Sequence, residues 1–305
     1  MNVYTDLTQC IGRTPLLHAQ RLIQAQQLSA RLLLKVEAFN PGGSVKDRVA
    51  LAMIEDAEQR GALLPGGTII EATSGNTGIG LAWIAKIKGY RLILTMPDTM
   101  SMERQQMLRL YGAEVVLTPG AEGMAGAVKR AEQLEQQIPG ALIMHQFENE
   151  ACVRAHEATT GKELLDDTDG SIDVFIAGVG TGGTLTGVAR ALKQSNPRIR
   201  IIAVEPQSSP VLSGGSRGAH AIQGIGAGFV PKIYDAQLVD EVIQVSDKEA
   251  LDGVQLLLAH EGLFAGISSG AALAACLKVA SRPDFQHATI ATILPDTGTR
   301  YLSSL

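Results

Sequence analysis

Short apolar stretches alternate with longer amphipathic stretches along the first half of the chain. Stretches rich in aliphatic and β-branched residues predict strands at 31–37, 67–72, 91–96 and 114–117. Between and after them, apolar residues at helical spacing predict helices over 46–60, 79–88, 101–111 and 124–137. Strands that alternate with helices in this way are typical of a doubly wound α/β fold with a mostly parallel sheet.

The same alternation returns in the second half with different loops. Strands are expected at 172–177, 199–205 and 288–294, and helices at 161–166, 185–194, 247–260 and 271–280. The stretch 206–231 is rich in Gly, Ser and Pro and has little periodicity, which is typical of a functional loop. Two domains are therefore expected, with a division near residue 148.

Lys46 lies where a glycine-rich loop runs into a predicted helix. Residues 40–43 read Asn-Pro-Gly-Gly, and Ser44 with Asp47 forms the Ser-x-x-acid pattern of a capping box. In the first helical turn the dipole disfavours a cation by roughly 0.3–1 kcal/mol and lowers the pKa of a lysine. A partly neutral amine can condense with a carbonyl. A surface lysine paired with Asp47 is the alternative that this stretch alone leaves open.

Three segments rich in Gly, Ser and Thr, at 73–78, 178–184 and 266–270, each open a predicted helix. Backbone N–H groups at a helix start bind anions, and the carboxyl ends of parallel strands gather such loops. We expect residues 181–184 to hold a phosphate and residues 73–77 a carboxylate. Taken singly, each segment is equally compatible with a plain strand–helix connection.

Composition narrows the classes of function. The 305 residues are enough for two domains, and a content of 45% hydrophobic and 19% charged residues describes a globular protein. A net charge of −5 without a basic run argues against nucleic acid as a partner. No apolar stretch has the length of a membrane span, and the start does not resemble a signal peptide. Three widely spaced cysteines argue against disulfides and a metal site, and favour the cytoplasm.

One alternative is an NAD-dependent oxidoreductase. Gly178, Gly180 and Gly183 satisfy the Gly-x-Gly-x-x-Gly fingerprint after a predicted strand, and Glu205 ends the next strand. This alternative does not account for Lys46 or for the hydroxyl-rich segment at 73–78. Because a phosphate-binding loop serves either cofactor, the fingerprint alone leaves both open.

Taken together, the motifs resemble those of the fold-type II, pyridoxal-phosphate-dependent β-family, and within it the cysteine synthases (O-acetylserine sulfhydrylases). The resemblance lies in Ser-Val-Lys-Asp-Arg at 44–48, Thr-Ser-Gly-Asn-Thr-Gly at 73–78, Gly-Thr-Gly-Gly-Thr at 180–184 and Gly-Ile-Ser-Ser-Gly at 266–270. Further segments agree at 11–16, 124–127, 223–229 and 300–303. The resemblance covers nearly the whole chain, in the order of the family.

The resemblance implies a fold like that of the tryptophan synthase β subunit, with two doubly wound α/β domains and mostly parallel sheets. Residues 36–148 would form the smaller, mobile domain that carries Lys46. Residues 1–35 and 149–305 would form the larger domain, which carries the phosphate loop and Ser268. The protein would be a homodimer, and members of this family also dock the C-terminus of serine acetyltransferase.

The resemblance also implies the site residues. Lys46 would be the catalytic Schiff-base lysine, which also shuttles the α-proton of the substrate, and Ser268 would meet the pyridine nitrogen. Pyridoxal 5′-phosphate would further be held by Asn76, Gly180, Thr181, Gly182, Gly183 and Thr184. The substrate would be bound by Thr73, Ser74, Asn76, Thr77, Gln146, Gly224 and Gly226. No metal is implied.

The implied reaction is a β-replacement that makes L-cysteine from O-acetyl-L-serine and sulfide through an aminoacrylate. A cystathionine β-synthase-like activity with homocysteine as the thiol is the alternative inside the family. A non-catalytic protein that grips a peptide C-terminus in the same cleft is another. The chain departs from the family pattern at 148–153, which lacks prolines, at Lys162 and at Ala221. These departures leave the substrate preference open.

Overall fold

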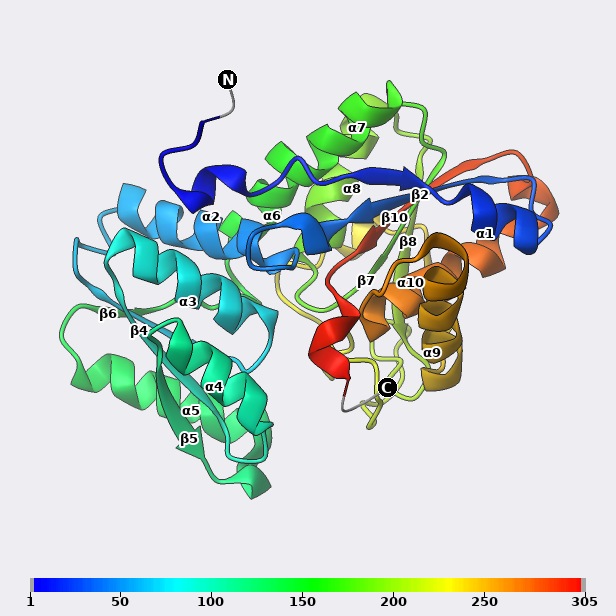
Figure 1. Ribbon diagram of the computed structural model, residues 1–305. Helices are drawn as coiled ribbons and strands as arrows, with labels where there is room; N and C mark the ends of the chain where they lie inside the picture. The colour runs from blue at the N-terminus through cyan, green and yellow to red at the C-terminus, as the bar shows by residue number, and fades with distance from the viewer. Residues whose placement is uncertain (1–2, 303–305) are drawn as a thin grey trace. The chain divides into compact units, whose positions relative to one another are not determined.

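The computed structural model describes residues 3–302, which form two compact units (Figure 1). The first unit contains the residues through Ile11 together with Lys46–Cys152, and the second contains Gly12–Val45 and the residues from Val153 onward. These bounds differ from the expected domain bounds, because residues 36–45 belong to the second unit and the N-terminal residues to the first.

The first unit contains a parallel four-stranded sheet with the strand order β5-β4-β3-β6. Its strands are β3 (Thr68–Ala72), β4 (Arg91–Pro97), β5 (Glu114–Thr118) and β6 (Ala141–Ile143). Its helices are α2 (Lys46–Gln59), α3 (Asn76–Lys88), α4 (Met102–Leu110) and α5 (Gly123–Gln137).

Successive residues of β4 face opposite sides of this sheet, as the two-residue period of a strand requires. Ile93 belongs to a buried cluster with Ile70 and with Ala131 of α5. Leu94 faces α3, since a Cβ atom added at Gly78 would lie 3.2 Å from its Cδ1. The sheet is therefore covered by α5 on one face and by α3 on the other.

The second unit contains a six-stranded sheet with the order β1-β2-β10-β7-β8-β9, in which β1 alone is antiparallel to its neighbour. Its strands are β1 (Leu16–His18), β2 (Arg31–Val36), β7 (Val174–Gly178), β8 (Arg200–Pro206), β9 (Glu241–Val245) and β10 (Thr289–Leu294). Its helices are α1 (Gln20–Ala25), α7 (Lys162–Thr168), α8 (Gly183–Ser195), α9 (Asp247–Leu256) and α10 (Ile267–Ala280), while α6 (Glu150–Ala155) contains the boundary at Cys152. The expected fold class, two α/β units with mostly parallel sheets, is confirmed.

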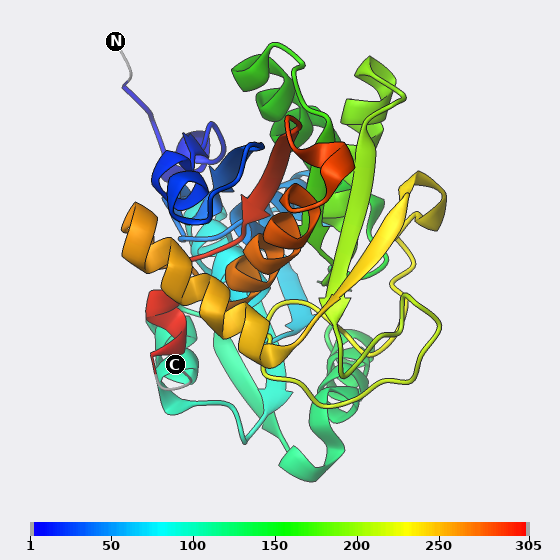
Figure 2. The ribbon, with the colours of Figure 1, turned by 90° about the vertical axis from the view of Figure 1, so that its right-hand side faces the viewer.

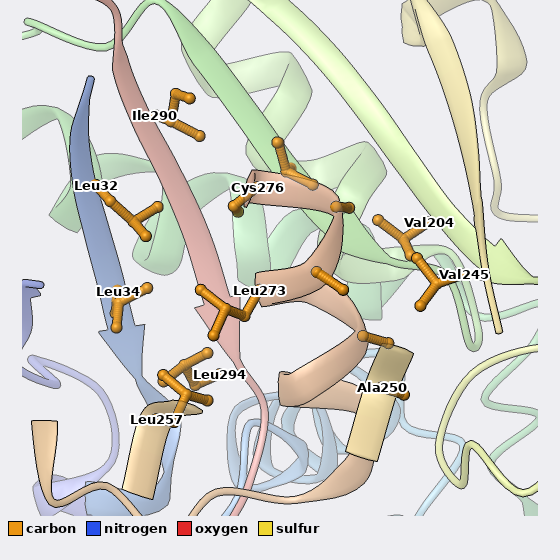
Figure 3. Close-up of a cluster of buried hydrophobic side chains, with 14 of the residues drawn as sticks. Leu32, Leu34, Val204, Val245, Ala250, Leu257, Leu273, Cys276, Ile290 and Leu294 are labelled. Carbon is orange, nitrogen blue, oxygen red and sulfur yellow. The ribbon is translucent and has the colours of Figure 1, made fainter. Parts of the chain in front are cut away.

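Two separate cores cover the two faces of the larger sheet. Leu32 and Leu34 belong to the core that contains α10, whereas Leu33 belongs to the core that contains α8. Figure 3 shows Leu273 and Cys276 of α10 among the side chains of the first core. In Figure 2, α9 and α10 lie on the side of this sheet that faces the viewer.

Several elements differ from the sequence-based expectation at their ends. Helix α10 begins at Ile267, so the segment 266–270 contains the first helical turn and does not precede it. Residues 150–168 form a continuous helical run in which a π-helix, His156–Gly161, joins α6 to α7. Since this run contains no proline, no residue in it lacks the backbone N–H that a helix requires.

The expectation of a long irregular segment is confirmed, because the described chain forms neither helix nor strand over 207–235. Among residues 3–302, none of the helices combines the length and the apolar character that a membrane crossing needs.

Candidate functional site

Lys46 is the first residue of α2 and directly follows a loop that is fixed by polar contacts. The side chain of Asn40 accepts from the Gly12 N–H at 2.9 Å and donates to the Glu37 carbonyl at 2.9 Å. Gly43 has φ +76°, a backbone angle that glycine adopts without strain. The Gly-rich sequence before Lys46 therefore forms one defined loop in the second unit.

The start of α2 is packed against α3 within the first unit. Asp47 is buried and accepts from the indole N–H of Trp83 at 3.1 Å. A Cβ atom at Gly80 would lie 3.0 Å from the backbone oxygen of Lys46 and 3.0 Å from Ala50 Cβ. Glycine at this position of α3 therefore permits the close approach to the turn that carries Lys46.

The candidate carboxylate loop, Thr73–Thr77, leads into α3, which begins at Asn76. Thr77 donates its hydroxyl to Gln146 Oε1 at 2.6 Å, and both side chains are buried. The N–H groups of the first turn have no carbonyl partner within the helix, so they are suited to an anion. The structure therefore brings the predicted Gln146 to the predicted loop, although the two are far apart in the sequence.

Glu71 fixes the backbone at Gln146 and was not predicted from the sequence. Its carboxylate accepts from the His145 N–H at 3.0 Å and from the Gln146 N–H at 3.3 Å. Burial raises the pKa of Glu71 to about 7, although backbone N–H groups of Gln146, His145 and Met144 act in the opposite direction. An acid at the end of an otherwise apolar strand was the signal in the sequence that could have indicated this role.

In the second unit, the segment Gly180–Thr184 forms a glycine-rich turn, called the cradle, at the start of α8. Gly182 has φ +88°, and a Cβ atom there would lie 2.8 Å from Tyr234 Cβ. A Cβ atom at Gly180 would lie 2.3 Å from the Gly224 carbonyl oxygen. Both positions therefore require glycine, and α8 begins at Gly183 with its first N–H groups directed to the same loop.

Thr184 contacts a histidine that the sequence analysis did not single out. The Nε2 atom of His156 lies 3.1 Å from Thr184 Oγ1, and its Nδ1 atom lies 2.9 Å from Thr160 Oγ1. His156 is fully buried. It reaches α8 because Gly187 allows the π-helix to approach, since a Cβ atom there would lie 2.7 Å from His156 Cβ. No pattern in the sequence indicates this contact, which depends on the packing of two helices.

Ser268, Gly224 and Gly180 lie together in the second unit. Ser268 is the second residue of α10 and is 3% exposed. A Cβ atom at Gly224, which has φ +93°, would lie 3.6 Å from Ser268 Oγ. Gly226 has φ +68° and its carbonyl lies 3.0 Å from His220 Nε2. By contrast, Ser269 is fully buried and its hydroxyl has no hydrogen-bond partner in the described structure.

Glu205 does not support the oxidoreductase alternative. Its carboxylate accepts from the Leu212 N–H at 2.7 Å, and from the N–H and hydroxyl of Ser213 at 3.2 and 2.5 Å. Both oxygens therefore hold the start of the 206–231 segment. In a dinucleotide site the acidic side chain must direct its oxygens to the ribose hydroxyl of the ligand. Glu205 does not do so, so the dinucleotide fingerprint lacks its acidic partner here.

The predicted residues fall into two sets. Lys46, the Thr73–Thr77 loop and Gln146 belong to the first unit, while Gly180–Thr184, Gly224, Gly226 and Ser268 belong to the second. Each unit has a helix start that is suited to an anion, and the second also has the Ser268 hydroxyl beside its cradle. A phosphate monoester and a carboxylate are the ligands that these two helix starts are suited to bind.

Comparison with known proteins agrees with these features. The model of the family described as pyridoxal-phosphate dependent enzyme matches residues 7–296. A cysteine synthase of Staphylococcus aureus (strain N315) is 49% identical over 300 residues, which are 98% of this chain and 96% of that protein.

Two solved structures extend the comparison to the fold. The crystal structure of a cysteine synthase from Entamoeba histolytica has a TM-score of 0.96 and 42% identity, covering 99% of this chain and 90% of that one. The crystal structure of O-ureido-L-serine synthase has a TM-score of 0.94 and 42% identity, covering 99% and 95%.

The residues present fit pyridoxal phosphate, since the turn at Gly182 suits a phosphate and the Ser268 hydroxyl lies near Gly224 in the same unit. The family match extends over almost the whole chain, and both segments that the resemblance predicts to bind anions lead into helices. The chain belongs to the family of pyridoxal-phosphate-dependent enzymes.

Proposed function

We propose that the chain is a β-replacement enzyme that makes L-cysteine from O-acetyl-L-serine and sulfide. The observation that carries this function is the cradle at Gly180–Thr184 with the Ser268 hydroxyl beside Gly224. This arrangement suits a phosphorylated pyridine ring that meets a hydroxyl and not a carboxylate. The 49% identity with cysteine synthases over 98% of the chain supports the same choice of reaction.

Lys46 would hold the cofactor through its Nζ atom, and the same amine would take up the α-proton of the substrate. When bound, pyridoxal phosphate supplies the electron sink that lets the α-proton and then the β-acetate leave. Asn40 fixes the loop before Lys46, and Gly80 packs against the backbone of Lys46 at the start of α2, so the lysine starts from a defined backbone position.

The Thr73–Thr77 loop binds the carboxylate of the amino acid. The N–H groups at the start of α3 and the hydroxyls of Thr73 and Ser74 supply donors to an anion, while the Thr77 hydroxyl hydrogen is bonded to Gln146. The Thr77 hydroxyl is oriented by Gln146, whose backbone is in turn held by Glu71. This chain of contacts fixes the substrate end that does not react, which aligns the α-carbon.

Ser268 tunes the chemistry toward elimination. A serine hydroxyl does not hold a pyridine nitrogen protonated as an aspartate would, so the ring is a weaker electron sink. A weaker sink disfavours reactions that need a long-lived carbanion, whereas prompt expulsion of acetate from the β-carbon tolerates it.

The test uses the purified holoenzyme and its visible spectrum. O-acetyl-L-serine alone should change the spectrum of a yellow protein, and sulfide should restore it with formation of one cysteine per cycle. Homocysteine in place of sulfide should restore it far more slowly. A faster return with homocysteine would favour the cystathionine β-synthase-like alternative, and no response to O-acetylserine would contradict the proposed donor.

Two protein partners and a location belong to the same proposal. A second copy of the chain would complete a homodimer, and the C-terminal residues of a serine acetyltransferase would compete with substrate for the carboxylate loop. Closure of the smaller domain on substrate stays a prediction of the family resemblance.

A cytoplasmic location accords with cysteines at 10, 152 and 276 that are free. Sedimentation of the pure protein, and competition by a C-terminal peptide, test the two partners.

A further inference from the structure

The C-terminal segment 295–301 is bonded to the loop that precedes Lys46. The Val45 N–H donates to the Pro295 carbonyl at 2.8 Å. Ser44 and Asp296 form an isolated antiparallel bridge. All of these residues belong to the second unit, so the contact is internal to that unit. The backbone directly before Lys46 is therefore hydrogen-bonded to the residues that follow β10.

The same segment is bonded on its other side to the start of α10. The Gly266 N–H donates to the Asp296 carbonyl at 3.1 Å, and Ala265 forms an antiparallel bridge with Thr297. A Cβ atom at Gly266 would lie 2.0 Å from Asp296 Oδ1, so only glycine permits this approach. Ser268 follows two residues later. The C-terminal segment thus lies between the loop that delivers Lys46 and the turn that carries Ser268.

Arg300 adds a side-chain contact to this arrangement. Its guanidinium donates to the Gly42 carbonyl, and a Cβ atom at Gly43 would lie 3.0 Å from Arg300 Nη2. The neighbouring Tyr301 donates its hydroxyl to the Asp296 carboxylate, and these two side chains are 5% and 1% exposed. The buried pair anchors the segment, which holds the guanidinium against the Gly-Gly sequence.

We propose that Arg300 is a positioning residue for Lys46: by holding the Gly42 carbonyl, it fixes the loop 42–45 and hence the backbone from which Lys46 emerges. Two adjacent glycines give this loop more conformational freedom than other residues would. A charged donor is the stronger kind of hydrogen bond for restricting it. The inference rests on the proposed role of Lys46 as the residue that bonds the cofactor.

The experiment compares wild type with Arg300→Met, which keeps the side-chain length without the guanidinium, and with Arg300→Lys, which keeps a charged donor. Apo-protein is mixed with pyridoxal phosphate and quenched with borohydride at increasing times, and the label at Lys46 is measured. A parallel titration uses 4-deoxypyridoxine 5-phosphate, which has a methyl group in place of the aldehyde. Hydrogen exchange of residues 42–48 is measured in the apo-proteins.

Arg300→Met should acquire the label about tenfold more slowly, as expected when one charge-assisted hydrogen bond is lost. Its affinity for the deoxy analogue should match wild type, its residues 42–48 should exchange faster, and Arg300→Lys should recover part of the rate. Arg91→Met is the matched control, because Arg91 pairs with Glu114 on the surface of the first unit. It should behave as wild type in all three measurements.

Two results would overturn the inference. One is labelling of Arg300→Met at the wild-type rate. The other is an equal loss of affinity for the deoxy analogue, which would mean a general disturbance of the site. If Arg300→Met does not fold, Arg300→Leu, which also lacks a donor to the Gly42 carbonyl, takes its place, and labelling and exchange at the wild-type rates in that variant would contradict the inference. Wild type without any label at Lys46 would contradict the proposed site, while faster exchange of residues 42–48 would still report the contact.

Discussion

The imidazole of His156 lies with its Nε2 atom 3.1 Å from the hydroxyl oxygen of Thr184, in the first turn of α8. Its Nδ1 atom lies 2.9 Å from the hydroxyl oxygen of Thr160. In a neutral ring one nitrogen donates and the other accepts. When Nε2 donates, the hydroxyl hydrogen of Thr184 is available to a phosphate oxygen. His156 can therefore orient Thr184 toward the anion that this turn is suited to bind.

Substitution of His156 should weaken the cofactor site according to the position of the remaining donor. His156→Asn retains only a group near Nδ1 and should lower the affinity for pyridoxal phosphate by about tenfold, the effect of one hydrogen bond. His156→Gln can place an amide N–H near the position of Nε2 and should lose less affinity for pyridoxal phosphate. Equilibrium dialysis of the apo-proteins measures both. When Thr184→Val is added, His156→Asn and His156→Gln should bind pyridoxal phosphate equally well. If the two still differed as much as they do beside Thr184, His156 would not act through the Thr184 hydroxyl.

Glu71 should make stability depend on pH with a sign opposite to that of most carboxylates. Its folded pKa of about 7 lies above the ordinary value of 4.5, so the folded state retains a proton that the unfolded state has lost. The contribution of Glu71 to the free energy of unfolding is full below pH 4.5 and is lost as the pH rises to about 7. Relative to Glu71→Gln, wild type should therefore lose roughly 3 kcal/mol of unfolding free energy across this range.

Urea unfolding at pH 5 and pH 8 measures that difference. Glu114→Gln is the control, because Arg91 lowers the pKa of this exposed carboxyl and the small effect should have the opposite sign. A difference between wild type and Glu71→Gln that is independent of pH would show that Glu71 does not titrate in this window.

Gly75→Ala should weaken substrate binding and leave the stability of the fold unchanged. Gly75 has φ −102°, an angle open to alanine, and no atom lies within 4 Å of an added Cβ. Thermal stability should stay within about 0.5 kcal/mol of wild type, as for substitutions that disturb no contact. The KM for O-acetyl-L-serine should rise about tenfold, since a methyl group would obstruct the N–H groups offered to its carboxylate. An unchanged KM would mean that the carboxylate binds elsewhere.

The two serines at the start of α10 should respond differently to a carboxylate. Ser268→Asp should alter the spectrum of bound cofactor and slow cysteine formation, because a carboxylate favours a protonated ring. Ser268→Ala should keep substantial activity. Ser269→Asp should instead reduce folding, since Ser269 is fully buried and a charge there would be unpaired. A spectral change from Ser269→Asp in a well-folded protein would move the assignment by one residue.

Much of the fold followed from periodicity in the sequence, because most strands of both sheets are rich in aliphatic residues; β9, Glu-Val-Ile-Gln-Val, is less apolar and was not predicted. The prediction failed where that signal is short or ambiguous. Strand β6 spans three residues, Ala141–Ile143, too few to show a pattern. The start of α10 was assigned to a turn because Gly and Ser predominate there, yet tertiary packing extends the helix back to Ile267.

The candidate site was predicted to a similar extent, and for similar reasons. Residues that act through backbone N–H groups left a visible motif of Gly, Ser and Thr. Residues that act through packing left none, since the contact of His156 with Thr184 depends on how the π-helix lies against α8. Arg300 reaches Gly42 across most of the chain length, and sequence spacing contains no information about that approach.

The most direct test of the whole account is the site of covalent attachment of the cofactor. The holoenzyme is reduced with borohydride and digested, and the labelled peptide is identified by mass spectrometry. We expect the label on Lys46, no label on Lys46→Ala, and at least a hundredfold loss of cysteine formation in that variant, about the effect of losing a general base. Lys86→Ala, at an exposed position of α3, should match wild type. A label on another lysine, together with an active Lys46→Ala variant, would contradict the account.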